Sequence, residues 1–363
     1  MEDSLCKICS YKTKKISITL PFFRHIDFKK DLNNIVLRKC MNCQMIHNYK
    51  NSNNITNLFK KKSYSLSKQT SHLVKNNKDY KRRTFYQAEI IYKIFRKKNN
   101  INVLDIGCFD GQLLLDMSKL FKKYNFFGYD INKKLIKLFP KKKNFKFFLS
   151  NLKNLNFKFD LIIMSHSIMY IEDLNNKLQI CKELLNKRGR IFIQFPNLKI
   201  NPFYCLMSDQ FQYPTENSIK NILKFNNFDT KIIKNRIFSR ELIILAKVGN
   251  HKKYKKLFKD YIFEEAINKI KKIKQNLLKI SEIQLNVLGT TVNAAFVDEI
   301  LSKKIIFFID EQKFKINNLF RGKKVIHPKK LINKDVTILP YGEKNKFILD
   351  NFKKQYKGNY YLI

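Results

Sequence analysis

Hydrophobic positions between residues 101 and 248 form short apolar runs that are separated by stretches of helical period. After a first run that ends at Ile106, strand-like runs lie at Asn125–Asp130, Asn144–Leu149, Phe159–Ser165, Arg190–Phe195, Thr230–Phe238 and Glu241–Val248. Helices are expected from about Gln112, at Glu172–Lys187 and at Ser218–Phe225. Alternating strands and helices that close with a hairpin predict an α/β fold with a seven-stranded, mostly parallel sheet.

A glycine-containing turn follows the first of these strands. Residues 103–111 read Val-Leu-Asp-Ile-Gly-Cys-Phe-Asp-Gly, without the G-x-G-x-x-G of a dinucleotide site. Glycine lets the backbone approach a ligand at the carboxyl end of the strand, and Asp130 at the end of the next strand can take the hydroxyls of a ribose. Asp105, two residues before the first glycine, suits a cationic ligand and repels a diphosphate. The turn therefore predicts a positively charged nucleoside cofactor.

This turn resembles motif I of the class I S-adenosylmethionine (SAM) methyltransferases. Residues 159–170 look like the fourth-strand motif of that class, and residues 184–193 look like its turn into the fifth strand. The resemblance implies a Rossmann-like domain that binds SAM, with Asn151 facing the adenine. The cofactor-binding residues are then expected to be Asp105, Gly107, Gly111, Asp130, Asn151 and Ser165.

Four of the seven cysteines form two C-x-x-C pairs, Cys6 with Cys9 and Cys40 with Cys43. Each pair presents two thiolates to one metal ion, and two pairs complete a tetrahedral Zn²⁺ site. A redox dithiol is the alternative for a single pair. It does not explain two pairs, and neither pair opens a thioredoxin-like βαβ unit. Four thiolate ligands leave no open position, so a structural zinc ion is predicted, with His47 as a candidate substitute ligand.

The pattern changes after Val248, where an amphipathic helical run leads into further strands. A glycine turn at Gly289 and a strand that ends at Asp310 predict a second, smaller α/β unit. Such a unit suits either a small-molecule cleft or a packing domain. Three domains are expected: a zinc-binding four-cysteine domain at 1–75, a SAM-dependent methyltransferase domain at 76–250 and a C-terminal α/β domain at 251–363.

Together the three parts resemble the zinc-containing sugar methyltransferases, including C-methyltransferases that act on dTDP-linked deoxysugars. Residues 64–72 look like the Tyr/Ser-rich segment that helps to line the active site in that family. Asp310 with the later Gly322-Lys323-Lys324 looks like the pattern of its C-terminal domain. The resemblance implies a methyltransferase whose substrate is a sugar, either nucleotide-linked or part of a glycan.

The chain departs from the C-methylating members of the family at the residues that handle protons. Tyr170 and the pair Asp209-Gln210 stand where those members have a histidine and a Glu-His pair. Removing a proton from carbon requires a base such as histidine, whereas a hydroxyl can lose its proton as the methyl group arrives. Both O- and C-methylation therefore stay open.

Four residues are candidates for the proton acceptor, in the order His166, Asp209, Tyr64 and Tyr170. Each has a structural alternative. His166 suits a hydrogen bond that orders its loop, Asp209 suits the cap of a turn, and the tyrosines suit packing.

The net charge of +44 raises a second hypothesis, an RNA methyltransferase with a four-cysteine module. The basic and aromatic segment Phe22-Phe23-Arg24 agrees with it. The lysines are spread along the whole chain, however. The abundant residues Lys, Asn and Ile all have A/T-rich codons, and such a codon bias is favoured over nucleic-acid binding as the cause of the charge. A third hypothesis is a non-catalytic methyltransferase-like scaffold.

The compartment is inferred from segments that the sequence lacks. No apolar run reaches the length of about 18 residues that a membrane span needs. The first residues, Met1–Ser4, lack the basic and apolar regions of a signal peptide. A cytoplasmic protein without membrane insertion is expected, in a compartment where thiols stay reduced.

Overall fold

The fold is given by a computed structural model, which describes residues 4–25, 27–32, 35–49, 57, 73–76, 79–96, 99–149, 151–249, 258–341 and 345–363. The chain forms two compact units. The first comprises Met1–Lys15, Leu37–Pro196 and Phe211–Lys259, and the second comprises Ile16–Val36, Asn197–Gln210 and Asp260–Ile363. Both contain segments from distant parts of the sequence, and the three-domain division at residues 75 and 250 stays a prediction.

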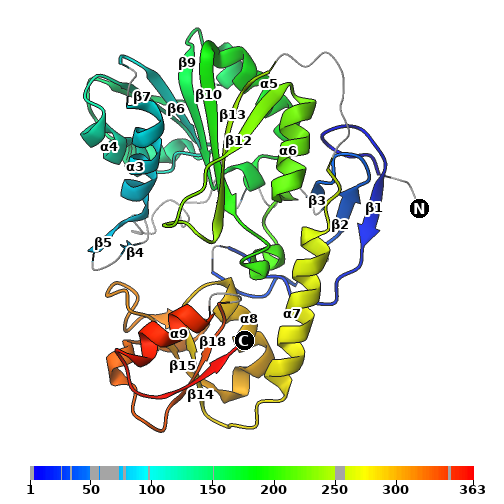
Figure 1. Ribbon diagram of the computed structural model, residues 1–363, viewed down its shortest axis with the longest axis vertical. Coiled ribbons are helices and arrows are strands. Elements are labelled where there is room, and N and C mark those ends of the chain that lie inside the picture. Colours follow the sequence, from blue (N-terminus) through cyan, green and yellow to red (C-terminus); the bar gives the residue numbers. More distant parts are fainter. Residues whose placement is uncertain are drawn as a thin grey trace. The chain divides into compact units, whose positions relative to one another are not determined.

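The first unit is built on a seven-stranded sheet of order β12-β13-β10-β9-β6-β7-β8 (Figure 1). Its strands are β6 (Asn102–Ile106), β7 (Asn125–Tyr129), β8 (Phe145–Phe148), β9 (Phe159–Ser165), β10 (Leu185–Pro196), β12 (Phe228–Ile232) and β13 (Glu241–Val248). The five central and edge strands from β10 to β8 run parallel, and β13 pairs antiparallel with both β10 and β12. The predicted Rossmann-like α/β sheet with its terminal hairpin is confirmed.

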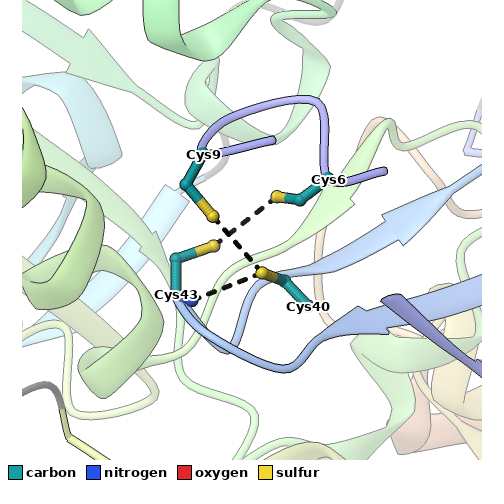
Figure 2. A group of neighbouring side chains, drawn as sticks. All are labelled: Cys6, Cys9, Cys40 and Cys43. Atoms are coloured by element: carbon teal, nitrogen blue, oxygen red, sulfur yellow. Dashed lines mark hydrogen bonds between the residues drawn. The ribbon is translucent and has the colours of Figure 1, made fainter. Parts of the chain in front are cut away.

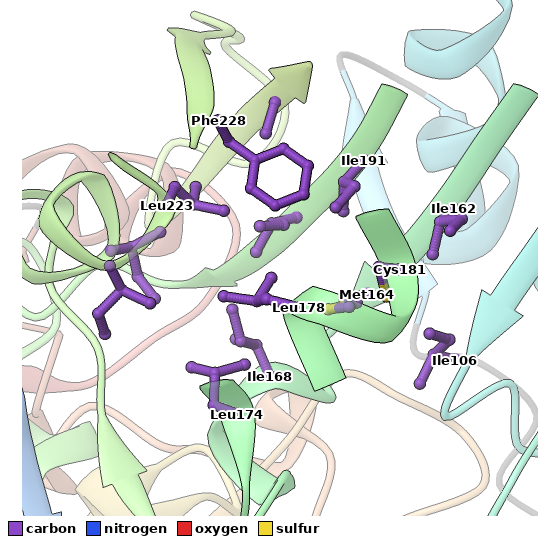
Figure 3. Packing of buried hydrophobic residues seen from close by; sticks show 14 of the residues in the cluster. Ile106, Ile162, Met164, Ile168, Leu174, Leu178, Cys181, Ile191, Leu223 and Phe228 are labelled. Atoms are coloured by element: carbon purple, nitrogen blue, oxygen red, sulfur yellow. The ribbon is translucent and has the colours of Figure 1, made fainter. Parts of the chain in front are cut away.

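Helices cover both faces of this sheet, which explains why its strands are apolar without alternation. The helices are α3 (Arg83–Phe95), α4 (Gln112–Leu120), α5 (Leu174–Leu184) and α6 (Glu216–Phe225). On β9, Ile162 and Met164 point into one core cluster (Figure 3), while Leu161 and Ile163 point into the other. Each such fully buried side chain contributes roughly 1.5–3 kcal/mol to folding. The sheet is therefore a rigid base for the loops at its carboxyl edge.

A smaller four-stranded sheet of the first unit has the order β1-β2-β3-β11. Its strands are β1 (Thr13–Ile16), β2 (Leu37–Cys40), β3 (Ile46–Asn48) and β11 (Gln212–Tyr213). The last strand comes from the loop after β10 and pairs antiparallel with β3, with Gln212 opposite His47. A separate hairpin, β4 (Leu73–Asn76) with β5 (Asp79–Arg82), leads directly into α3. The loop that follows β10 thus completes the sheet that carries the second cysteine pair.

The second unit contains the predicted smaller α/β fold, which the structure confirms. Its six-stranded sheet has the order β16-β17-β15-β14-β18-β19, parallel except for the β16–β17 pair. The strands are β14 (Leu285–Leu288), β15 (Ile305–Ile309), β16 (Leu319–Phe320), β17 (Lys323–Ile326), β18 (Val336–Leu339) and β19 (Asn359–Leu362). The helices are α7 (Ile262–Leu278), α8 (Val292–Leu301) and α9 (Asn345–Lys353). Across the described part of the chain, no helix is long and apolar enough to cross a membrane.

Two distant segments join this second unit through hydrogen bonds. The amide of Phe23 donates to the carbonyl of Leu206 at 2.8 Å, and the amide of Ser208 donates to the carbonyl of Phe23 at 2.8 Å. Arg321 donates to the carbonyl of Phe28 at 2.7 Å and to the carboxylate of Asp298 at 2.6 Å. Residues 16–36 and 197–210 are therefore structural parts of the C-terminal α/β unit.

Candidate active site and cysteine cluster

The turn between β6 and α4 has two glycines in the left-handed region of backbone space. Gly107 has φ +81° and Gly111 has φ +76°. A Cβ atom on Gly107 would lie 2.6 Å from the Cβ of Ser167, and one on Gly111 would lie 2.6 Å from the ring of Phe139. Because residues with a Cβ rarely adopt this conformation and a Cβ would also clash at both positions, glycine is strongly favoured there.

Two carboxylates flank this turn. Burial, together with the charge of Asp130, raises the pKa of Asp105 to about 8. Asp130 follows β7, and it accepts hydrogen bonds from the amides of Phe109 at 3.1 Å and Asn132 at 2.9 Å. Burial raises the pKa of Asp130 as well. Within the described ranges, neither carboxylate forms an ion pair with a lysine or arginine, so a cationic ligand would supply the missing charge.

Two further polar atoms border the turn and were not found from the sequence. The Oγ of Ser167 and the Nε2 of Gln112 are buried, and neither has a hydrogen-bond partner among the described residues. Ser167 lies against Gly107, and Gln112 is the first residue of α4. Ile131, directly after Asp130, leaves 46% of its surface exposed at the same edge. The only signal for these residues in the sequence is their position next to a motif.

The site fits SAM. Its sulfonium and amino groups carry the positive charge that a buried Asp105 favours, and a ribose can bind the carboxylate of Asp130. The remaining predicted cofactor residue of this group, Asn151, is exposed and accepts a hydrogen bond from the amide of Lys153 at 3.2 Å. The roles of Asp105, Gly107, Gly111, Asp130 and Asn151 stay predictions that this geometry supports.

Ser165, at the end of β9, begins a chain of buried and partly buried hydrogen bonds. Gln87 of α3 donates from Nε2 to the Oγ of Ser165 at 2.6 Å and to the Oε1 of Gln194 at 3.0 Å. Gln194 of β10 donates in turn to the Oε2 of Glu241 at 2.6 Å. The same oxygen accepts from Arg83 at 2.5 Å and lies 3.0 Å from the Nε2 of His166. His166 is thus tied to helix α3 and strands β10 and β13.

The structure describes two of the other three candidate proton acceptors. Tyr170 is half-buried at the end of a 3-10 helix, Ile168–Tyr170. Asp209 is buried in the second unit, where its Oδ2 accepts a hydrogen bond from the amide of His25 at 2.7 Å. Tyr64 lies outside the described residues, as does the whole segment 64–72. All four assignments stay predictions.

The four cysteines of the N-terminal pairs converge on one point (Figure 2). Their sulfur atoms all lie within 4.8 Å of one another, with Cys6 and Cys43 3.7 Å apart and Cys9 and Cys40 3.4 Å apart. Four sulfurs about 2.3 Å from a tetrahedral zinc ion would be about 3.8 Å apart. The amide of Cys43 also donates to the sulfur of Cys40 at 3.3 Å, which favours a thiolate. The cluster fits a structural zinc ion.

His47 lies beside this cluster. Its Nε2 is 3.2 Å from the sulfur of Cys6, and burial lowers the pKa of His47 to about 4, so its ring is neutral at pH 7. His47 thus contacts one of the predicted ligands, and its role as a substitute ligand stays a prediction.

Comparison with known proteins gives the domain its class. Residues 79–231 match the family model described as a methyltransferase domain. The protein is a SAM-dependent methyltransferase. The matched residues contain the whole glycine turn, both flanking carboxylates and His166. No curated protein matches this methyltransferase at a significant level.

Solved structures that are similar to the methyltransferase cover slightly less than half of it. One is the plantazolicin methyltransferase BpumL in complex with a monoazolic desmethylPZN analog and SAH. It is 19% identical in sequence, the match covers 46% of this chain and 84% of that chain, and the TM-score is 0.40. A SAM-dependent methyltransferase from Clostridium acetobutylicum has 16% identity, coverages of 45% and 91%, and a TM-score of 0.35. Human N-acetylserotonin methyltransferase in complex with SAM has 15% identity, coverages of 45% and 52%, and a TM-score of 0.38.

The raised pKa of Asp105 leads to a prediction about pH. Below pH 8 the free carboxyl is mostly protonated, whereas a bound cation requires the carboxylate, so binding releases a proton. We expect the affinity for SAM to rise by up to about tenfold per pH unit from pH 6 and to level off above pH 8. Isothermal titration calorimetry in buffers of different ionisation enthalpy measures both the affinity for SAM and the number of protons released on binding.

The control for this experiment is Asp105→Asn, which retains only the titration of the cofactor itself. Equal proton release by the variant and the wild-type protein would contradict the assigned role of Asp105.

Proposed function

We propose that this methyltransferase transfers the methyl group of SAM to a sugar, either a nucleotide-linked deoxysugar or a sugar of a glycan. The observation that carries the proposal is the way in which the cysteine cluster is built into the methyltransferase domain. Strand β11 extends the sheet of the cluster, and Asn221 of α6 donates to the carbonyl of Cys43 at 3.2 Å. Cys6, Cys40 and Cys43 share a core cluster with the main sheet. A tethered nucleic-acid-binding finger would not need these contacts.

Each residue of the site has a role in this reaction. When bound, SAM would supply a methyl group on a positively charged sulfur, open to attack by the acceptor from the side opposite to the sulfur. Asp105 would hold the positive charge, Asp130 the ribose, and Gly107 the close approach of the backbone. Holding acceptor, methyl and sulfur in line is worth several kcal/mol. The choice between O- and C-methylation depends on which base is present. C-methylation needs a base that removes a proton from carbon, and Tyr170 and Gln210 stand where the resemblance expects histidines for this task.

The four thiolates would hold a structural zinc ion. A closed Cys₄ site contributes to folding and supplies no Lewis acid to the reaction. The ion would join the Cys6–Cys9 loop to the β2–β3 turn, and both would be fixed on the methyltransferase domain.

An RNA methyltransferase is the second candidate, because the net charge is +44. The aromatic segment that agreed with it does not support it in three dimensions. Phe22 is 7% exposed and Phe23 is 0% exposed, so these rings are not free to stack on bases. Arg24 pairs with Asp27 at 2.5 Å. The remaining support is the charge and the four-cysteine module. A non-catalytic scaffold is the third candidate, and failure to bind SAM would favour it.

Transfer of isotopically labelled methyl from SAM tests the proposal. The acceptors are two pools from the source organism, total RNA and an extract of nucleotide sugars and surface glycans, with Gly107→Ala protein as the blank. We expect label in the sugar pool, and digestion of the labelled product then separates O- from C-methylation. Label in RNA alone would overturn the proposal.

A further inference from the structure

Three exposed apolar side chains surround the two cysteine loops. Each is one or two positions from a cysteine of the cluster, and the exposed fractions are 59% for Leu5, 48% for Tyr11 and 51% for Met41. By contrast, the apolar side chains that anchor these loops to the core, Ile8 and Met45, are buried. Packing of the loops therefore does not account for the three exposed side chains, and neighbouring exposed apolar groups mark interaction sites.

Backbone contacts bring these three residues together around Lys12. Leu5 forms an antiparallel bridge with Lys12. Tyr11 is the residue before Lys12, and its carbonyl accepts a hydrogen bond from the amide of Cys6 at 2.8 Å. The amide of Met41 donates to the carbonyl of Lys12 at 3.2 Å. The three side chains thus leave the backbone at neighbouring positions, and the converging cysteines beside them (Figure 2) restrict how far these positions can separate.

Basic side chains border the apolar ones. Residues 4–16 and 37–48, which we call the cysteine module, contain lysines and one arginine but no aspartate or glutamate. Glu2 and Asp3, which lie outside the described residues, and a Zn²⁺ ion with four thiolates would still leave the module positive. The exposed basic side chains of the module are Lys7, Lys12, Lys14 and Lys15. We call these lysines, together with the three exposed apolar side chains, the knuckle surface.

An anionic lipid membrane matches the apolar and the basic part of this surface at once. Apolar side chains are stabilised when they leave water at the boundary of the acyl chains, and lysines are attracted to the anionic headgroups above that boundary. Tyrosine favours the same interface, because its ring is apolar and its hydroxyl stays hydrated. The long apolar stem of lysine lets neighbouring side chains enter the boundary while the ammonium stays among the headgroups.

Protein and nucleic-acid partners match this surface less well. Protein interfaces are depleted in lysine and enriched in arginine, whereas the exposed basic side chains of the module are all lysines. Arg38 is engaged within the module, since it donates to the Oγ1 of Thr13 at 2.8 Å and to the carbonyl of Thr13 at 3.1 Å. Single-stranded nucleic acid stacks its bases on aromatic rings, and the knuckle surface offers one ring, Tyr11, beside two aliphatic side chains.

We propose that the knuckle surface docks the methyltransferase on an anionic lipid membrane. Leu5, Tyr11 and Met41 would lie at the boundary of the acyl chains, with the lysines among the headgroups. Docking of this kind is peripheral and needs no membrane-spanning helix. A docked enzyme would reach acceptors that are held at the membrane. The proposal does not depend on which acceptor is methylated, and its test does not use methyl transfer.

A tryptophan at position 11 tests the proposal, because the chain contains no tryptophan of its own. In Tyr11→Trp the indole lies on the knuckle surface, and its fluorescence shifts to the blue when the ring leaves water. The matched control is Leu319→Trp, since Leu319 is 72% exposed and lies in the second unit. Both full-length proteins are titrated with vesicles of phosphatidylcholine alone and with vesicles in which about one third of the lipid is phosphatidylglycerol.

We expect a blue shift of Tyr11→Trp with the anionic vesicles, and none with phosphatidylcholine alone or in Leu319→Trp. An equal shift in both proteins would overturn the proposal, because the net charge of +44 would then attract the protein without a preferred surface. The absence of a shift in Tyr11→Trp would overturn it as well. A response of Tyr11→Trp to single-stranded RNA and none to vesicles would assign the surface to nucleic acid instead.

Removal of the apolar side chains separates their contribution from that of charge. In cosedimentation with the same anionic vesicles, we expect the double variant Leu5→Ser and Met41→Ser to bind about tenfold more weakly than the wild type, although its net charge is unchanged. Leu319→Ser, the matched control, should bind as the wild type does. Wild-type binding by the double variant would show that the apolar side chains do not enter the membrane and would contradict the proposal.

Removal of lysines tests whether the position of the charge matters. The double variant Lys12→Gln and Lys14→Gln should lose about fivefold in binding for each lysine. The control variant, Lys313→Gln and Lys329→Gln, removes the same charge from exposed positions in the second unit, and we expect a total loss of less than about twofold, because salt screens charges that are distant from the membrane. Equal losses in the two variants would contradict docking through the knuckle surface.

Discussion

Replacing Gly107 with alanine is expected to abolish detectable SAM binding while the chain remains folded. The position has φ +81°, which costs an alanine about 1–2 kcal/mol. The new methyl would also lie 2.6 Å from the Cβ of Ser167, closer than such atoms approach, so one of the two turns that border the cofactor must shift. We expect the affinity measured by calorimetry to fall at least about 100-fold, because both turns contribute to one site.

Gly322→Ala is a matched control for this variant. Gly322 has φ +84°, nearly the same backbone conformation, and a Cβ there would meet no atom within 4 Å. It lies in the second unit, in the turn between β16 and β17. This variant has the backbone strain without the steric contact, and we expect it to bind SAM normally with a slightly lower melting temperature. Equal SAM affinity in the two variants would show that the space above Gly107 is not part of the cofactor site.

The sheet and its glycine turn could be predicted because their signals are local. Residues 161–164 of β9 are all 0% exposed, and a strand that is covered on both faces reads as an uninterrupted apolar run. Element ends were less accurate. The helix expected to reach Lys187 ends at Leu184, because Leu185 already pairs with Phe159 and begins β10. Helical propensity continues past that point, and pairing with a neighbouring strand overrides it.

The contacts that assemble the candidate site could not be predicted, since they join residues far apart in the sequence. Arg83 and Glu241 are 158 positions apart, and neither belongs to a motif. Likewise, β11 joins β3 across the chain, although its two residues carry no strand signal of their own. A carboxylate at the start of an apolar strand was the only sign of Glu241 in the sequence. Single-sequence periodicity identifies faces of elements, whereas ion-pair partners depend on tertiary contacts.

The same limit applies to the two-unit division. Residues 197–210 follow the fifth strand of the main sheet in sequence, yet they pack with the C-terminal unit, where Asp209 contacts His25. Composition does not change at either end of this segment, so no boundary signal marks it. Its assignment depends on backbone hydrogen bonds to residues far earlier in the sequence, such as the one from Ser208 to Phe23.

Removing one thiol of the cysteine cluster is expected to release the zinc ion and to unfold the sheet around it. We expect about one zinc per chain in the wild-type protein by elemental analysis, and less than a tenth of that in Cys40→Ala. Three thiolates and a neutral His47 carry one negative charge less than four thiolates, so they are expected to hold the zinc ion more weakly. Cys181→Ala is the matched control. Cys181 is as buried as Cys40 but is not one of the four converging cysteines, so this variant should retain the metal.

The extent of unfolding follows from what else holds this small sheet. Metal binding and folding are one equilibrium in small zinc modules, which unfold without the ion. Here β11 and the core contacts of Ile8 and Met45 also attach the sheet to the methyltransferase domain. Hydrogen exchange in Cys40→Ala should therefore rise strongly over residues 4–16 and 37–48, and little in β6 or β9, and SAM affinity should change less than about threefold. Zinc retention by Cys40→Ala, or a wild-type protein purified under reducing conditions that binds no added zinc, would contradict the assignment, because four thiolates that converge within 4.8 Å need a cation to balance their charge.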